Sequence, residues 1–535
     1  MKGKAFKSIV LVLSIVLMLV GGASAQDDGT VIPIEPGPET SLPDYIGAPA
    51  KAHPTANSGV PQDPNLAPYP FPHSHSDIWM SDTMDIAGPL GRNPVTLSTT
   101  LAAAHENSWM IQCGSMSFDS HGRLIAICFG VDEASVVLVD PDTLEMLSYY
   151  KLGVIKGPPY GEGDQKILLS TFAIYGYLDN RDLLHIVSET KKITTLEVVD
   201  TLSGPVFEPV DDGYDLSELV GDGNRISGVM MDFQGRYWIN MGTSATIYVL
   251  NPKTAEAPYL DLPRVNLGEG EFTRNGLALT KEGAAYIVTT EAMYRVDAGA
   301  DDQPYIVWEA PYETIGEVRS GQYEKGSGTT PTVLGEGKYV AITDNADQMQ
   351  VVVFRTDERL DPGEDRIVCE VPVFDFPGGG AGAGSNSLTG LRNSLLVQNT
   401  SDYLYDWGYE DAPARLVQPG KPGIERIDID PNGRGCTKVW VNTEVTSNMC
   451  MKLSTRTGLI YTQDRKYDAE NDVYAVYWAA LDFFTGEVVW EKLAGTFAKS
   501  GLARFDNWWE PLAVGPNGSL YGTVYGGITM MRDTP

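Results

Sequence analysis

The chain has 535 residues and a formal net charge of −32 at pH 7, from 71 acidic and 39 basic residues. An acidic surface of this strength repels nucleic acid and anionic membranes, so we expect no nucleic-acid partner. No apolar stretch reaches the roughly 20 residues that span a bilayer, so no membrane span is predicted.

Residues 1–25 have the pattern of a secretory signal peptide. Three lysines precede the apolar run 9–20, and Ala23-Ser-Ala25 provides small residues for cleavage. We therefore predict an exported protein, secreted or periplasmic, whose mature chain begins at Gln26. A retained N-terminal anchor is the alternative.

Residues 26–93 form a proline-rich N-terminal arm. Proline lacks a backbone donor and favours extended chain, so regular structure is not expected here. We predict an arm that lies over the body of the protein and is flexible until about Ala67.

The arm contains one candidate metal site, at His73, His75 and Asp77. If this segment is extended, side chains two residues apart project from the same face, which suits a metal ion. A solvated surface loop is the alternative interpretation.

From residue 94 onward, short strands alternate with turns. In residues 226–262, Val229, Met231 and Phe233 are apolar at alternate positions, and a Gly-Arg turn leads into a second strand at Tyr237. Four short strands joined in this way make an antiparallel meander. A lone meander buries one face at best, so it needs neighbours of its own kind.

The same unit recurs along the chain roughly every 55 residues. Its innermost strands are expected to begin near Cys113, Ser170, Ser227, Asn275, Thr330, Ser387, Cys450 and Pro511. Such a period is typical of a β-propeller. The predicted fold is all-β: a single propeller over residues 94–535, with eight four-stranded blades.

Two details of this propeller stay open. The turn at Asp430 either opens a separate blade or belongs to an outer hairpin of the preceding one, so seven to nine blades are compatible with the pattern. Only three strands fit after Trp509. We expect a strand within residues 94–102 to complete the last blade and close the ring.

Cys113 and Cys128 are placed symmetrically about the turn at residues 120–121. They would face each other across one hairpin. Since the signal peptide implies an oxidising compartment, we predict a disulfide between them.

Residues 480–490, ALDFFTGEVVW, resemble the tryptophan-docking repeat of quinoprotein-type propellers. The resemblance implies that Asp482 and Thr485 bind the turn backbone and that Trp490 stacks between blades. Quinoprotein dehydrogenases resemble one another in a vicinal cysteine pair at the cofactor, whereas the cysteines here stand singly at 113, 128, 369, 436 and 450. No CxxCH motif occurs either. We therefore expect neither a quinone cofactor nor haem.

Residues 274–290 resemble the blade signature of gluconolactonase and strictosidine-synthase-like propellers, in the pattern RNGLAL followed by EG and YIVTT. The resemblance implies that Asn275 faces the channel and coordinates a divalent cation. Only Asn275 matches that motif. Asp344, Asn345 and Asn399 are further candidate ligands because of their places at strand ends.

A propeller commonly binds its ligand at one mouth of the channel, where the innermost strands begin. The predicted ligand-binding residues there are Arg225, Arg274, Asn275, Thr330, Asn386, Trp508 and Glu510. Their carboxylate and amide oxygens suit Ca²⁺ or Mg²⁺, and aromatic rings among them suit a sugar or an apolar ligand face. The alternative is a channel filled with polar side chains and water.

The sequence lacks a GxSxG elbow, a P-loop and an HExxH motif. Three functions are compatible with it: binding of a small molecule, glycan or partner protein at the channel mouth; divalent-metal-assisted hydrolysis, as in a lactonase; and quinone-dependent oxidation, which the cysteines disfavour. We favour binding, because no acid–base pair is visible, and we expect a monomer.

Overall fold

The computed structural model describes residues 24–25, 31–101, 104, 112–129, 133–154, 175–188, 191–221, 224, 226–322, 325–406, 415–507 and 511–535. Most of the predicted signal peptide lies outside these ranges. No helix among the described residues has the length and apolar character of a membrane span.

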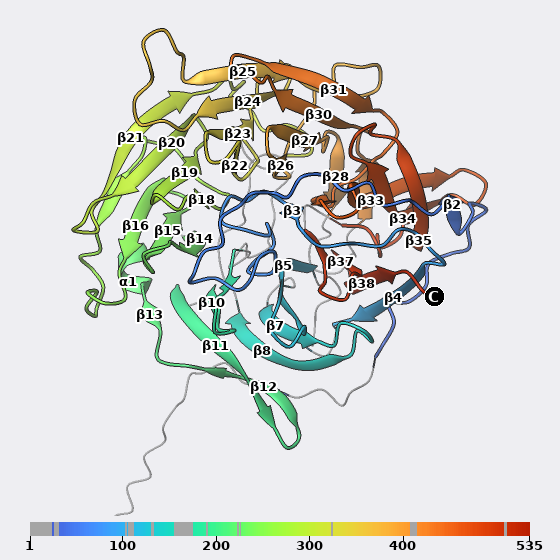
Figure 1. The fold of residues 1–535 in the computed structure, drawn as a ribbon. Coiled ribbons are helices and arrows are strands. Elements are labelled where there is room, and N and C mark those ends of the chain that lie inside the picture. The colour runs from blue at the N-terminus through green and yellow to red at the C-terminus, as the bar shows by residue number, and fades with distance from the viewer. Residues whose placement is uncertain are drawn as a thin grey trace, which may run out of the picture.

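The described strands form a ring of eight four-stranded antiparallel blades, which confirms the predicted propeller (Figure 1). Blades 1 and 2 contain β5 (Gln112–Phe118), β6 (Leu124–Phe129), β7 (Glu133–Val139) and β8 (Met146–Val154), then β9 (Tyr177–Leu178), β10 (Leu184–Val187), β11 (Lys192–Thr201) and β12 (Gly204–Pro209). Blades 3 and 4 contain β14 (Ile226–Met231), β15 (Tyr237–Met241), β16 (Thr246–Leu250) and β17 (Arg264–Asn266), then β18 (Ala278–Leu279), β19 (Ala284–Val288), β20 (Ala292–Ala298) and β21 (Pro304–Pro311).

Blades 5 and 6 contain β22 (Thr332–Leu334), β23 (Tyr339–Thr343), β24 (Gln350–Arg355) and β25 (Ile367–Pro372), then β26 (Thr389–Leu391), β27 (Ser394–Gln398), β30 (Ile424–Ile429) and β31 (Cys436–Asn442). Blades 7 and 8 contain β32 (Lys452–Ser454), β33 (Leu459–Asp468), β34 (Val473–Asp482) and β35 (Val488–Ala498), then β36 (Leu512–Val514), β37 (Leu520–Val524), β38 (Gly527–Arg532) and β4 (Val95–Thr100). Small elements outside this scheme are β1 (Ser24–Ala25), β2 (Tyr45–Gly47), β3 (Thr83–Met84), β13 (Tyr214–Asp215), α1 (Ser217–Val220), β28 (Tyr403–Asp406) and β29 (Arg415–Pro419).

Strands from the two ends of the chain share blade 8. β4 pairs antiparallel with β38 over its whole length, from Val95 opposite Arg532 to Thr100 opposite Gly527. This pairing gives β38 a neighbour on its outer side, so the last C-terminal strand is not left as a free edge.

In blades 1, 2 and 3, an aspartate side chain holds the turn between the two inner strands. In blade 3, Asp232 Oδ1 accepts hydrogen bonds from the backbone N–H groups of Gln234 (3.0 Å) and Arg236 (2.9 Å). Its Oδ2 accepts from Arg236 Nε and Trp238 Nε1, both at 2.8 Å. Gly235 supplies the positive φ of 79° that the turn requires. One acidic residue thus satisfies four donors and sets the register of the hairpin.

The turn at Asp430 connects β30 with β31, so it belongs to the outer hairpin of blade 6. The inner turn of that blade lies at Arg392 and Asn393, between β26 and β27. A further hairpin, β28–β29, is inserted after β27 and lengthens this blade in the sequence. The ambiguity in the blade count is therefore resolved in favour of eight.

Two disulfides are present in the described residues. Cys113 and Cys128 are joined across β5 and β6, as the sequence predicts. Cys369 and Cys436 are joined between β25 and β31, the outer strands of adjacent blades. The second pairing was not predicted, since its partners lie 67 residues apart in the chain.

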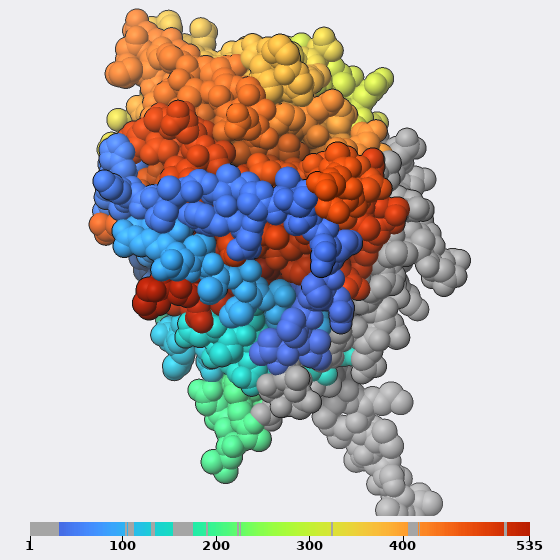
Figure 2. Space-filling model, turned by 90° about the vertical axis from the view of Figure 1, so that its right-hand side faces the viewer, coloured from blue at the N-terminus to red at the C-terminus, as the bar shows by residue number. Residues whose placement is uncertain are grey.

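The N-terminal arm is bound to the body from residue 31 onward, instead of remaining free until Ala67. β2 pairs with β35 and adds a strand to blade 7. Asp468 accepts hydrogen bonds from Thr40 Oγ1 (2.8 Å) and the Ser41 backbone (2.7 Å), and His53 N–H donates to Thr457 O (2.8 Å). Figure 2 shows the arm in blue across the face of the molecule formed by the C-terminal blades.

Trp490 is fully buried on β35 and lies in an apolar cluster with residues of blade 8, among them Leu512 and Leu520. Its ring centroid is 6.2 Å from that of Tyr461. We expect Trp490→Ala to lower the free energy of unfolding by about 3–5 kcal/mol, because it leaves a cavity between blades.

Chemical denaturation measures this change. Leu202→Ala is the control, because Leu202 is fully exposed at the β11–β12 turn and its loss should change stability by less than about 0.5 kcal/mol. Equal effects of the two substitutions would contradict a structural role for Trp490.

Candidate functional site

Part of the arm lies inside the ring. Residues 66–84, the channel segment, cross the centre of the propeller, where Figure 1 shows β3. Each inner strand has one edge that faces the channel, and its N–H groups need acceptors. Carbonyls of the channel segment supply them: Pro72 to Leu178 N (2.7 Å), Ile78 to Leu279 N (2.8 Å), Trp79 to Val333 N (2.9 Å), Ser81 to Gly390 N (2.7 Å) and Asp82 to Leu453 N (3.1 Å).

The donors are the middle residues of β22, β26 and β32 and the last residues of β9 and β18. The channel segment therefore lies along the inner strands from their middle to their end, beside the opening that we call the strand-end mouth. The opposite opening, where the inner strands begin, is the strand-start mouth. The predicted ligand-binding residues belong to the strand-start mouth.

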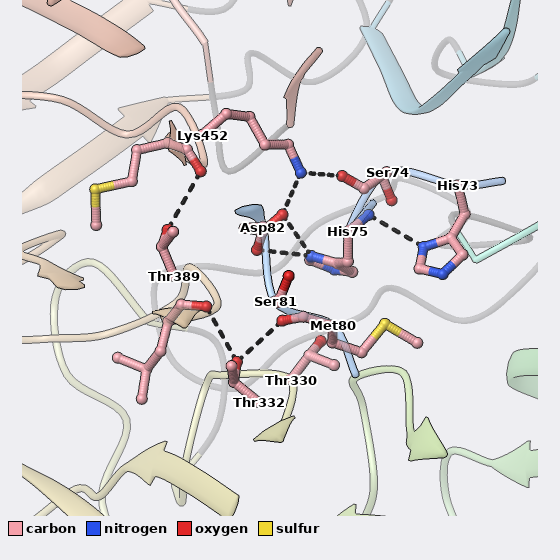
Figure 3. A network of polar contacts seen from close by, with 12 residues as sticks. His73, Ser74, His75, Met80, Ser81, Asp82, Thr330, Thr332, Thr389 and Lys452 are labelled. Atoms are coloured by element: carbon pink, nitrogen blue, oxygen red, sulfur yellow. Dashed lines mark hydrogen bonds and ion pairs between the residues drawn. The ribbon is translucent and has the colours of Figure 1, made fainter. Parts of the chain in front are cut away.

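A buried polar network anchors the channel segment to blade 7 (Figure 3). The ammonium group of Lys452 contacts both the Asp82 carboxylate and the Ser74 carbonyl oxygen. His75 Nδ1 lies 3.0 Å from Asp82 Oδ2. Burial raises the pKa of Asp82, but the Lys452 charge and His75 lower it more, so the net shift of its pKa is downward. Asp82 is therefore a buried carboxylate held in its charged form.

The metal site predicted at His73, His75 and Asp77 assumed an extended chain, and that assumption is wrong. Two successive turns form here, closed by Ser76 N–H to His73 O and Met80 N–H to Asp77 O, both at 3.0 Å. His75 consequently points to Asp82, whereas Asp77 turns back to accept from Trp79 N–H at 2.8 Å. The three side chains do not converge.

His73 and Asp77 are both buried and have shifted pKa values. Burial, followed by His75 and Lys452, lowers the pKa of His73 to about 3. Its Nδ1 accepts from His75 N–H at 3.1 Å, so the proton of the neutral ring lies on Nε2, which has no partner in the described residues. Burial raises the pKa of Asp77 to about 7, although hydrogen bonds from Ser81 and Trp79 oppose the shift.

Three asparagines at the starts of inner strands carry buried amide atoms at the strand-start mouth. Asn386 Nδ2 donates to Asn448 O at 3.0 Å, and Asn275 O accepts from Asn240 Nδ2 at 2.9 Å. Asn386 Oδ1, Asn448 Nδ2 and Asn275 Nδ2 have no hydrogen-bond partner among the described residues. Burying such a group without a partner costs free energy, so these atoms call for an explanation.

Tyr175, a residue that the sequence analysis did not select, lies across the channel. Its hydroxyl is 3.3 Å from Thr330 Oγ1, so a side chain of blade 2 reaches blade 5. Its ring stacks on His75 of the channel segment, with centroids 5.9 Å apart and planes 22° apart. Burial raises its pKa, whereas Thr330 and the charge of Arg274 lower it.

Glycines make room for this ring. A Cβ atom at Gly276 would lie 3.0 Å from Tyr175 Cδ1, and one at Gly228 would lie 3.6 Å from Tyr175 Cβ. The RNG sequence at 274–276 thus has a second role, since the glycine after Asn275 lets a neighbouring aromatic ring enter the channel. No sequence pattern around Tyr175 predicts that its ring enters the channel.

The other predicted ligand-binding residues divide into two groups. Arg225, Trp508 and Glu510 lie outside the described residues. Arg274 is partly buried beside Tyr175, on whose pKa its charge acts. The described part of the predicted site therefore consists of Arg274, Asn275, Thr330 and Asn386.

The candidate metal ligands away from Asn275 are engaged in their own turns. Asp344 Oδ1 accepts from Gln350 N–H at 2.7 Å, and burial raises its pKa to about 6. Asn399 Oδ1 accepts from Ser401 N–H (3.0 Å) and its Nδ2 donates to Gly379 O (2.8 Å). Asn345 Nδ2 donates to Glu317 O at 2.9 Å, whereas its Oδ1 is buried without a partner in the described residues.

Within the described ranges, no three His, Cys, Asp or Glu side chains are grouped closely enough to hold a metal ion. Amide oxygens of asparagine, which can also bind a cation, are a separate class of ligand. The cation site around Asn275 therefore stays a prediction.

A scan against known protein families finds no match. An uncharacterized protein of Archaeoglobus fulgidus is 26% identical over 342 residues, which cover 59% of this chain and 63% of that protein. The chain thus matches less than two thirds of that relative's length.

Similar solved structures include a streptogramin B lyase (TM-score 0.35, 10% identity, 82% of this chain and 98% of that chain). A putative 6-phosphogluconolactonase of Bacteroides uniformis has a TM-score of 0.37, with 12% identity over 72% of this chain and 98% of that chain. A periplasmic gluconolactonase of Pseudomonas aeruginosa has a TM-score of 0.32, with 12% identity over 74% and 99%. These likenesses assign no function.

We expect Lys452→Met to lower the free energy of unfolding by about 3–5 kcal/mol, because it leaves the Asp82 charge buried without its main partner. Chemical denaturation at about pH 7 provides the measurement. Lys421→Met is the matched control: this lysine is 41% exposed and its ion pair is long, so the change should stay below about 1 kcal/mol.

The stability difference between wild type and Lys452→Met should depend on pH in a defined direction. In the wild type the pKa of Asp82 is lowered, so its contribution to stability is present above the unfolded pKa and is lost as the pH falls. Without Lys452, burial alone would raise that pKa, and protonation would relieve the penalty. The stability difference between wild type and Lys452→Met should therefore shrink on acidification to about pH 4, and a constant difference would contradict the buried ion pair.

Proposed function

We propose that this protein is an exported propeller that binds a small uncharged molecule at the strand-start mouth. The observation that carries the proposal is the set of unpartnered buried amide atoms of Asn275, Asn386 and Asn448. Native proteins rarely leave buried donors and acceptors unpaired unless a ligand, ion or water meets them.

Two further features support a small ligand. The channel segment lies beside the strand-end mouth, so we place the ligand at the opposite opening. The unpartnered groups at that mouth are neutral amides, which suit the hydroxyl groups of an uncharged ligand, and the charged Arg274 lies beside them. The two disulfides are in keeping with an oxidising compartment outside the cytoplasm.

A panel of neutral small molecules tests the proposal: hexoses, nucleosides and glucono-1,5-lactone. We expect at least one to raise the melting temperature of the wild type with increasing concentration, because a ligand that binds only the folded ring stabilises it. The shift should be lost in Asn275→Ala and Asn386→Ala.

Asn432→Ala is the matched control, since Asn432 lies exposed in the outer turn of blade 6. If every shift persists in the two mouth variants, or if no compound shifts the wild type, the ligand site is not at the strand-start mouth.

A divalent-metal-assisted hydrolase is the second candidate. One observation favours it: Asn345 Oδ1 is buried without a partner beside Asp344, and hard cations take such oxygens. If this candidate is correct, millimolar Ca²⁺ should raise the melting temperature over that in EDTA for the wild type, and less for Asn275→Ala and Asn345→Ala.

Acid release from glucono-1,5-lactone in the presence of Ca²⁺ then measures turnover. Identical melting curves in all samples, together with no acid release, would exclude the hydrolase and leave the binding function alone.

A further inference from the structure

The Tyr175 ring lies just before β9, against the channel segment. One face of the ring stacks on His75 of that segment. Tyr175 is partly exposed and precedes the start of an inner strand. An aromatic ring in this place is available to a ligand that enters from the strand-start mouth.

Contacts around its edge fix the plane of this ring. Gly228 lies near its Cδ2 atom and Gly276 near its Cδ1 atom, and its hydroxyl lies 3.3 Å from Thr330 Oγ1. His75 beneath it is held 3.0 Å from Asp82 Oδ2, and Asp82 is paired with Lys452. The ring therefore rests on a support that cannot shift without breaking a buried ion pair.

The amide groups of the same mouth precede inner strands, as Tyr175 does. Asn275 directly precedes Gly276, which borders the ring, and Asn386 is linked to Asn448 at 3.0 Å. Two of the unpartnered atoms are N–H donors and one is a carbonyl acceptor. A ring with an apolar face and hydroxyl groups around its edge satisfies both features, since hydroxyls both donate and accept.

We propose that the strand-start mouth binds a neutral carbohydrate, whose sugar ring stacks on Tyr175 while its hydroxyl groups meet the amides of Asn275, Asn386 and Asn448. This inference rests on the proposed function and narrows it to one ligand class. It also assigns Tyr175 as the residue that selects for a sugar ring.

The test starts from an array of immobilised neutral glycans, and the glycan that binds best is then titrated in solution. Wild type, Tyr175→Ala, Tyr175→Phe and Asn386→Ala are compared by isothermal titration calorimetry. We expect Tyr175→Ala to weaken binding about tenfold or more, whereas Tyr175→Phe keeps the aromatic face and stays within about threefold of wild type.

Tyr305→Ala is the matched control, since Tyr305 on β21 is 51% exposed on the outside of the ring and should leave affinity unchanged. Thermal melts confirm that each variant is folded. If Tyr175→Ala does not fold, Gly276→Ala replaces it in the comparison. Its Cβ would lie 3.0 Å from the Tyr175 ring and displace that ring.

The outcomes separate this inference from the proposed function. If Asn386→Ala weakens glycan binding and Tyr175→Ala does not, the site is at the mouth but the role of Tyr175 is wrong. If neither Asn386→Ala nor Tyr175→Ala changes glycan binding, the glycan binds elsewhere, and both the carbohydrate inference and the proposed ligand site are contradicted. The absence of binding to every neutral glycan would overturn the carbohydrate inference, whereas the small-molecule panel would still decide the proposed function.

Discussion

Every inner strand of a propeller has one edge that faces the central channel and needs hydrogen-bond partners. In this protein the N-terminal arm supplies such partners. Backbone carbonyls from Pro72 to Asp82 accept hydrogen bonds from the inner strands of successive blades. The ion pair between Lys452 and Asp82 then fixes the arm at blade 7. The filling of the channel by the arm and the support under Tyr175 both follow from this one placement.

The repeat itself could be predicted because it depends on local chemistry. Aspartate turns such as that at Asp232 satisfy several donors within five residues, so each leaves a readable pattern in the sequence. The hairpin disulfide of Cys113 and Cys128 was equally local. The disulfide between Cys369 and Cys436 joins two blades, and no local sequence pattern predicts it.

The site was only partly predictable for the same reason. Asn275 and Asn386 could be selected as candidates because the start of an inner strand defines where a side chain lies in a propeller. Tyr175, Asp82 and Lys452 act across the channel through contacts between segments that are distant in the sequence. The arm was expected on the surface because a polar, proline-rich segment normally stays in water; here the channel offers it hydrogen-bond partners instead.

The order of the arm's contacts has a consequence for how the chain is assembled. The arm precedes every inner strand in the sequence, and its five described backbone carbonyls that accept from inner strands do so in ascending order of blades: Pro72 at blade 2, Ile78 at blade 4, Trp79 at blade 5, Ser81 at blade 6 and Asp82 at blade 7. A chain that folds from its N-terminus therefore already carries the template on which each new blade docks. β38 is the strand that pairs with β4, so the ring cannot close around its own beginning until β38 has been made.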